Sequence, residues 1–154
     1  MKTSVCLFAL FLAGCNTTPT ANTGADHPRE KAQIEQRLNQ IFDAAEKKDF
    51  ERLESYHLYG AGFTKFSPES PTRMDAATAR KGERDGLQAV SDLYMKAQDL
   101  KIDIFDNTGI ATFIFDYGFK AGTNTVQKQA RATLVFVKDS GEWKITHEHF
   151  SPAN

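Results

Sequence analysis

The amino-acid sequence predicts an α+β fold, in which helices pack on one face of an antiparallel β-sheet. Two observations indicate this class. Apolar residues recur at helical spacing near the start of the chain, whereas after Gln98 they alternate with polar residues at every second position. The chain has 154 residues and no internal repeat, so we expect one domain with its own core.

The first helix is expected to begin at Pro28, with Asp26 or His27 as its cap, and to run for about twenty residues. A short second helix is predicted after Asp49, whose carboxylate can cap it. One apolar stripe on the first helix is formed by Ile34, Leu38, Ile41, Phe42 and Ala45.

The middle of the chain is expected to hold a short strand around residues 63–66 and a third helix after Asp85 and Gly86. Residues 72–85 are charged and rich in alanine, which indicates a loop or an irregular helix rather than core. The third helix is predicted from four apolar residues at helical spacing. They are Leu87, Val90, Leu93 and Tyr94.

The last third of the chain predicts a meander of long strands. The alternation begins at Leu100, and β-branched and aromatic residues dominate the segments after Gly109. The strands are expected at residues 100–104, 110–119, 126–137 and 143–150, with turns at 106–109, 121–125 and 139–141. Helices that precede such a meander pack together on one face of the sheet.

The first 26 residues are expected to be a leader and a tether. Residues 5–12 are apolar apart from Cys6, and this run is far shorter than the roughly 20 residues of a membrane-spanning helix. It ends in "LAGC", which resembles the lipobox of bacterial lipoproteins. The resemblance implies a signal peptide over residues 1–14 and a diacylglycerol on Cys15. The alternative is an ordinary cleaved signal peptide with a chance cysteine.

Residues 15–26 are polar and contain Pro19 and Gly24, which is typical of a flexible tether, and the domain is expected over residues 27–154. We therefore expect a lipid-anchored protein of the bacterial cell envelope. By resemblance to enterobacterial sorting, Asn16 favours the outer membrane, with the domain facing the periplasm, in a Gram-negative organism.

Composition argues against several classes of function. The chain has 19 basic and 20 acidic residues, a net charge of −1, so it lacks the basic footprint of a nucleic-acid binder. Its two cysteines are Cys6, which leaves with the signal peptide, and Cys15. The mature domain therefore has no disulfide, cysteine nucleophile or thiolate metal site. We predict no cofactor and no metal.

The last hairpin carries a recognisable pattern, "RATLVFVKDSGEWKITHEHFS". An Arg-x-Thr motif begins at Arg131, Gly-x-Trp leaves the turn at Trp143, and His-x-His comes after it at His147 and His149. With the order helix–helix–strand–helix–meander, this pattern resembles SnoaL-like domains of the nuclear transport factor 2-like superfamily over residues 28–151. It is also similar to the association domain of calcium/calmodulin-dependent protein kinase II.

The resemblance implies a cone, in which a strongly curved antiparallel sheet wraps around the first helix and a pocket opens at one end. It also implies a homodimer formed through the outer sheet face. Where the kinase association domain has an arginine in its pocket, this hairpin offers Leu134 or Phe150, which argues against the same anionic ligand. The superfamily includes isomerases, cyclases, dehydratases and oligomerisation modules, so the fold alone assigns no activity.

A pocket wall is expected on the last hairpin. If residue 137 pairs with residue 143 across the turn, the guanidinium and the two imidazoles share one face with the indole. Tyr117 joins this face if the preceding turn has an even register, and Tyr56 belongs to an aromatic cluster expected near the rim of the cone. The predicted ligand-binding residues are Arg131, Thr133, His147, His149, Trp143, Tyr117 and Tyr56.

Three interpretations of the histidines remain open. They could bind a metal, although a third ligand would have to come from His57 or Asp116. They could act as acid–base groups beside Arg131, in an enzyme of the isomerase, dehydratase or cyclase type whose catalytic candidates are His147, His149 and Arg131.

In the third interpretation, which we favour, the histidines are structural supports in a half-polar pocket wall. The expected function is then non-catalytic binding of a small, partly apolar molecule, or an interaction role in the envelope. A structural dimer with a vestigial pocket is a further class.

Overall fold

The computed structural model describes residues 27–153 of the chain. The predicted signal peptide, Cys15 and the tether lie outside these residues. Within residues 27–153, no helix is both long and apolar enough to cross a membrane.

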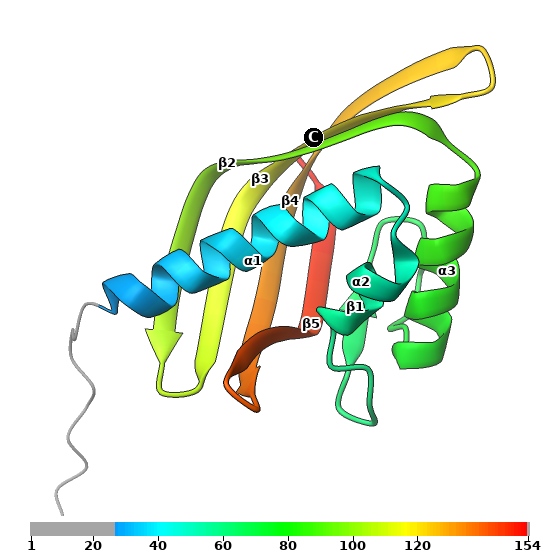
Figure 1. The fold of residues 1–154 in the computed structure, drawn as a ribbon. Helices are drawn as coiled ribbons and strands as arrows, with labels where there is room; N and C mark the ends of the chain where they lie inside the picture. The colour runs from blue at the N-terminus through cyan, green and yellow to red at the C-terminus, as the bar shows by residue number, and fades with distance from the viewer. Residues whose placement is uncertain (1–26, 154) are drawn as a thin grey trace, which may run out of the picture.

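Two helices and a short strand precede a third helix and four long strands (Figure 1). The elements are α1 Pro28–Glu46, α2 Phe50–Ser55, β1 Thr64–Phe66, α3 Ala76–Gln88, β2 Ser91–Phe105, β3 Thr108–Ala121, β4 Asn124–Asp139 and β5 Glu142–Pro152. The strand order is β1-β5-β4-β3-β2, in which β1 runs parallel to β5 and the other neighbours are antiparallel.

The predicted α+β architecture with a curved sheet is confirmed. Figure 1 shows α1 lying across one face of the sheet, with α2 and α3 grouped beside β1 at one end. The caps that define the first two helices are also as predicted. His27 is the N-cap of α1, and the Asp49 carboxylate accepts a hydrogen bond from the Arg52 amide at the start of α2.

Bulges bend the sheet around α1. The pairing of β2 with β3 shifts register between Ser91 and Tyr94 and again between Gln98 and Lys101. Asp92 and Asp99, which lie in these two places, have φ values of 50° and 52°. Aspartate adopts this left-handed conformation more readily than most residues, and a bulge bends and twists the strand that contains it.

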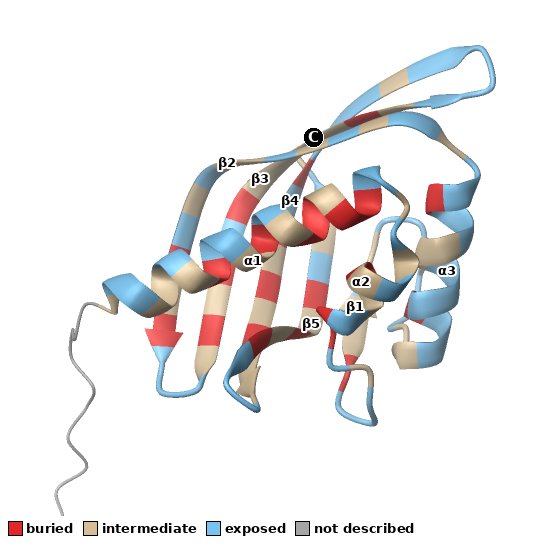
Figure 2. Cartoon of the chain, in the orientation of Figure 1, coloured by how far each residue is buried: buried red, intermediate tan, exposed pale blue. Residues whose placement is uncertain are grey.

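The core lies between α1 and the concave face of the sheet (Figure 2). Ile34 and Leu38 of α1 are fully buried against Phe136 of β4 and Ile145 of β5. Gly109 lets the helix come close, because a Cβ at this position would lie 2.2 Å from the Ile34 Cδ1 atom. The apolar stripe predicted from the sequence is therefore the face that holds the helix on the sheet.

The predicted third helix was misplaced. Helix α3 covers Ala76–Gln88, much of it in the segment expected to be a loop or irregular helix, and Asp75 caps it by accepting from the Thr78 amide at 2.8 Å. Of the residues expected to form a helix after Gly86, Leu87 belongs to the end of α3, whereas inward Leu93 and exposed Tyr94 alternate at the start of β2. Pairing with β3 overrides the helical spacing of the apolar residues there.

Replacement of Leu38 by Ala tests the packing of α1. The change should lower the free energy of unfolding by about 2–5 kcal/mol, because it leaves a cavity in the core. Gln36→Ala, on the exposed side of the same helix, should change it by less than about 0.5 kcal/mol. Urea denaturation followed by circular dichroism measures both, and equal effects would contradict this packing.

Candidate ligand-binding site

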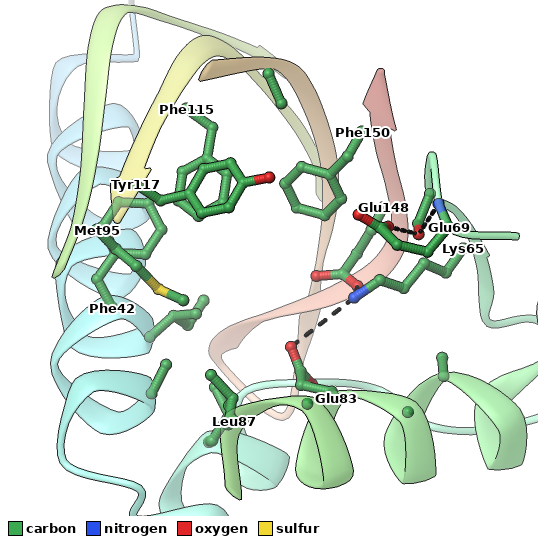
Figure 3. A pocket seen from close by; sticks show the side chains of 18 of the residues that line it. Phe42, Lys65, Glu69, Glu83, Leu87, Met95, Phe115, Tyr117, Glu148 and Phe150 are labelled. Atoms are coloured by element: carbon green, nitrogen blue, oxygen red, sulfur yellow. Dashed lines mark hydrogen bonds and ion pairs between the residues drawn. The ribbon is translucent and has the colours of Figure 1, made fainter. Parts of the chain in front are cut away.

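A cavity of about 610 Å³ lies between α1, α3 and the inner face of the sheet, and it is partly open to solvent (Figure 3). The last turns of α1 form one side, and α3 forms another. The loop after β1, residues 67–70, borders it as well. Most of the lining is apolar, which suits a small molecule with an apolar body.

Aromatic rings form one wall of the cavity. The Phe115 ring lies at the centre, 4.8 Å from the Tyr117 ring, 5.6 Å from the Phe42 ring and 5.6 Å from the Phe150 ring, measured between centroids. Tyr117 and Phe115 share this face because alternate residues of a strand point to the same side. The six aromatic residues of the lining are Phe42, Phe113, Phe115, Tyr117, Phe119 and Phe150.

Charged side chains gather opposite this wall (Figure 3). Lys65 of β1 and Glu148 of β5 are partners in the parallel pairing, and the Lys65 Nζ atom lies 2.7 Å from the Glu148 Oε2 atom. The same Nζ atom lies 3.8 Å from Oε1 of Glu83 on α3. The other Glu83 oxygen accepts a hydrogen bond from the Tyr59 hydroxyl at 3.1 Å. Two carboxylates from distant elements thus meet at one ammonium group.

His57 extends this cluster behind Glu148. Its side chain is fully buried, and its Nδ1 atom lies 2.9 Å from the Leu53 carbonyl oxygen, which can only accept. Its Nε2 atom lies 3.4 Å from the Glu148 Oε1 atom. A carbonyl and a carboxylate face the two nitrogens, an arrangement that favours a proton on each of them. Burial opposes this charge, but Glu148 keeps the His57 pKa above its usual value.

The cluster is a fixed set of charges. Burial favours the neutral form of Glu148, yet the Lys65 ammonium and His57 together hold the pKa of its carboxyl well below the usual range. Burial likewise disfavours the charged Lys65, but Glu148 and Glu83 raise the pKa of its ammonium. Neither group therefore exchanges its proton near neutral pH.

The cluster also has donor atoms at a spacing that suits a metal ion. One donor atom from each of His57, Glu83 and Glu148 lies within 4.8 Å of the others. The Lys65 ammonium, however, is already bound to Glu148 and near Glu83. It supplies the positive charge that these carboxylates need, so the cluster is complete without a metal.

Comparison with known proteins places this fold in a family. Residues 34–154 match the family model of the SnoaL-like domain. The protein belongs to the SnoaL-like domain family. No protein with a curated description matches the chain at a significant level.

Solved structures of the nuclear transport factor 2-like superfamily share the fold of this SnoaL-like domain. A candidate dehydratase from Streptomyces avermitilis superimposes with a TM-score of 0.76 at 20% identity, covering 82% of this chain and 98% of that chain. A superfamily member from Salmonella enterica gives 0.74 at 15% identity, covering 84% and 94%. The association domain of the C. elegans calcium/calmodulin-dependent kinase II gives 0.67 at 18% identity, covering 80% and 96%.

The histidines of this SnoaL-like domain lie on the outer face of the sheet, so their expected placement in the pocket wall was wrong. The Thr64 hydroxyl lies 2.7 Å from His147 Nδ1, and the Phe66 ring lies 5.8 Å from the His149 ring. Neither imidazole lines the cavity. Glu148, between them in the sequence, points to the opposite face and into the cavity.

A β-bulge at Thr146 explains the difference. Near the turn Phe136 pairs with Ile145, but the next pair is Val135 with His147, so Thr146 has no partner. The expected pairing of residue 137 with residue 143 was also wrong by one residue, because Val137 pairs with Lys144 and Trp143 pairs with Lys138. This shift at the turn puts the odd-numbered residues of β4 on the outer face. One added residue turns every later side chain to the other face of the sheet. Ile145 and Glu148 therefore both face inward although they are three positions apart.

Arg131 and Thr133 share the outer face with the histidines, as the sequence grouped them, but this face is not the cavity. Thr133 pairs with His149, and neither residue lines the cavity. Arg131 is exposed and donates from Nε and Nη2 to the Pro152 carbonyl oxygen at 3.2 and 2.8 Å.

Two further candidates, Trp143 and Tyr56, belong to the core. The Trp143 indole is buried and donates to the Gln33 side-chain oxygen at 3.3 Å. The Tyr56 hydroxyl accepts from Arg52 Nε at 2.7 Å. Among the seven predicted ligand-binding residues, all within the described part of the chain, Tyr117 alone lines the cavity.

The charged cluster of His57, Lys65, Glu83 and Glu148 was not predicted from the sequence. Its members come from four separate parts of the chain, so no local spacing connects them. One feature of the sequence could have indicated the cluster: Lys65 lies between Thr64 and Phe66 in the segment that forms β1. A charge at an inward position of a strand requires a partner, but the sequence did not identify Glu148 as that partner.

Lys65→Met tests the role of the ammonium. Removing it leaves the buried Glu148 carboxylate with one partner less, so the free energy of unfolding should fall by about 3–5 kcal/mol. Adding Glu148→Gln to this variant should recover at least half of the loss, because the buried charge is then absent.

Lys81→Met is the matched control, since this lysine is 78% exposed and should cost less than about 0.5 kcal/mol. Chemical denaturation at pH 7 measures all three variants. A cost for Lys65→Met no greater than that of the control would show that the buried pair does not stabilise the fold.

Proposed function

We propose that this protein is a lipid-anchored component of the bacterial envelope whose SnoaL-like domain binds a small, largely apolar molecule without transforming it. The cavity of about 610 Å³ is the observation that carries the proposal. Pockets that bind small molecules commonly have this size, a mostly apolar lining and a few polar groups at one side. The aromatic wall and the charged cluster supply these two parts.

The fixed protonation states of the cavity's charged groups favour binding over catalysis. Glu148 keeps its charge far below neutral pH, and Lys65 keeps its proton far above it. An effective acid–base group has a pKa near the working pH. Among the described residues of the cluster, His57 is the group closest to that range, and it does not line the cavity.

An enzyme of the isomerase, dehydratase or cyclase type is the second candidate. The contact between His57 and the buried Glu148 carboxylate favours it, because a histidine oriented by a carboxylate is a common element of acid–base sites. In such an enzyme Glu148 would face the substrate, and Tyr117 would be the hydroxyl group across the cavity.

The proposed attachment to the membrane rests on the "LAGC" sequence that ends at Cys15. A lipid on this thiol would hold the domain at the envelope, and Asn16 favours the outer membrane of a Gram-negative cell. We also propose a homodimer through the outer face of the sheet, where Phe66 is 42% exposed beside the two histidines. The similarity to the fold of kinase association domains supports self-association.

Gly86→Phe tests the cavity. Gly86 lines the cavity from α3, and a Cβ added there would meet no atom within 4 Å, so a side chain can start from this position toward the cavity. N-phenyl-1-naphthylamine, a neutral dye that fluoresces in apolar surroundings, should bind the protein saturably. The variant should weaken this binding by about tenfold or more, because the ring occupies the ligand's place.

Gly86→Ala is the matched control. It removes the same glycine from the helix but adds only a methyl group, so dye affinity should stay within about twofold while helix stability rises slightly. Thermal melting confirms that both variants fold. Equal dye binding by the Phe and Ala variants would show that the cavity is not the binding site.

Cys15→Ala tests the anchor. Without the thiol no lipid can be attached, so the protein should move from the membrane fraction to the soluble fraction of lysed cells. Cys6→Ala is the control, because this cysteine belongs to the segment expected to be removed. Unchanged membrane association of the Cys15 variant would refute the lipid anchor.

A further inference from the structure

We infer that the cavity selects an organic cation, namely an amine with an apolar or aromatic body, over neutral and anionic molecules of the same shape. The inference rests on the proposed function and names the class of ligand. Three features carry it: an excess of carboxylates around the cavity, an aromatic wall, and the position of Glu69 at the opening.

Carboxylates outnumber cationic groups around the cavity. Among the described residues that line it, Lys65 is the one basic residue, whereas Glu69, Glu83 and Glu148 are acidic. Lys65 lies 2.7 Å from Glu148 and 3.8 Å from Glu83, so its charge is already shared between two partners. His57 lies behind Glu148, so each of the two buried carboxylates has a basic group beside it. The third carboxylate, that of Glu69, is left in excess.

Glu69 is the one exposed carboxylate among the three that line the cavity. It accepts a hydrogen bond from the Ser67 hydroxyl and forms no close ion pair within residues 27–153, although its charge contributes, after those of Glu148 and Glu83, to raising the pKa of the Lys65 ammonium. A second hollow, of about 670 Å³, shares Glu69 and Tyr117 with the cavity, so the carboxylate stands where the two spaces meet. An ammonium group placed there keeps part of its hydration while the apolar body enters the cavity, which lowers the cost of binding a charge.

The aromatic wall suits a cation as well as an apolar body. The faces of aromatic rings carry partial negative charge and attract cations within about 6 Å of the ring centroid. The protein already uses this contact, because Lys65 Nζ lies 5.4 Å from the centroid of the Phe150 ring. Phe115 lies next to this ring and is stacked on Tyr117, which borders the second hollow together with Glu69, so a second cation near Glu69 would also lie near an aromatic group.

The tyrosines next to the cavity report the same negative potential. Burial raises the pKa of the Tyr117 hydroxyl, and the negative charge of Glu69 raises it further. Burial and the charges of Glu83 and Glu148 raise the pKa of Tyr59 in the same way. An anionic ligand would face this potential with no unpaired basic residue of the described lining to offset it.

A matched series of ligands tests the inference on the purified full chain. The series is 4-phenylbutylamine, 4-phenylbutanol and 4-phenylbutanoate, which share one apolar body and differ in the charge of the end group. Competition against N-phenyl-1-naphthylamine measures their affinities. The amine should bind about tenfold more tightly than the alcohol, and the carboxylate should bind most weakly.

Glu69→Gln identifies the group responsible. It should weaken binding of the amine about threefold, as expected for a partly exposed charge pair, and leave the alcohol unchanged. Glu83→Gln should have a smaller effect on the amine, because Lys65 already lies beside this carboxylate, and its side-chain oxygen can still accept from Tyr59. Glu142→Gln is the control, because this carboxylate is 63% exposed at the β4–β5 turn and does not line the cavity.

The outcomes separate this inference from the proposed function. If the alcohol or the carboxylate binds as tightly as the amine, and Gly86→Phe still blocks the dye, the selection for cations is overturned and the binding function stands. An equal loss of amine affinity in the Glu142 and Glu69 variants also overturns it. If neither the dye nor any member of the series binds, both proposals fail.

Discussion

A single unpaired residue in β5 decides which side chains meet the cavity. Before Thr146, Trp143 and Ile145 turn toward the core, and after it the inward positions are Glu148 and Phe150. Without the bulge the inward positions would continue with the odd-numbered residues, which are the two histidines. The bulge therefore gives the cavity a carboxylate and an aromatic ring in place of two imidazoles.

The carboxylate of Glu148 then determines what surrounds it. A buried charge needs a close partner, and the parallel pairing of β1 with β5 brings Lys65 directly beside it. Strand β1 has only three residues, so backbone pairing alone holds it weakly to the sheet. The ion pair, with Glu83 of α3 on its other side, links β1, β5 and α3. The charged groups at the polar end of the cavity thus also hold these three elements together.

The sequence predicted the fold where a pattern extends over many residues. The stripe of α1 and the alternation of the last strands each repeat often enough to identify the element. The prediction failed at the start of β2, because the apolar residues there are also spaced as in a helix. They are Leu87, Val90, Leu93 and Tyr94. Only pairing with β3 decides between helix and strand.

The residues of the candidate site were harder to predict from the sequence than the fold. The sequence placed Glu148 on the face opposite His147 and His149, and the structure agrees with that grouping. Which face is the inner one depends on the bulge, and Thr146 is an ordinary strand residue that does not mark it. The partners of Glu148 also come from segments that only the folded chain brings together. The lipid anchor at Cys15 stays a prediction.

The position of the cavity along α1 has a consequence for the proposed anchor. The described chain begins at His27, next to Pro28 at the first turn of α1, whereas Ile41, Phe42 and Ala45 border the cavity near the other end. At 1.5 Å of rise per residue, Pro28 and Ile41 are separated by about 20 Å along the helix axis. If the proposed tether is present, it would join the domain at the end of α1 remote from the cavity. The proposed lipid and the proposed ligand would then occupy opposite ends of α1, so neither would block the other.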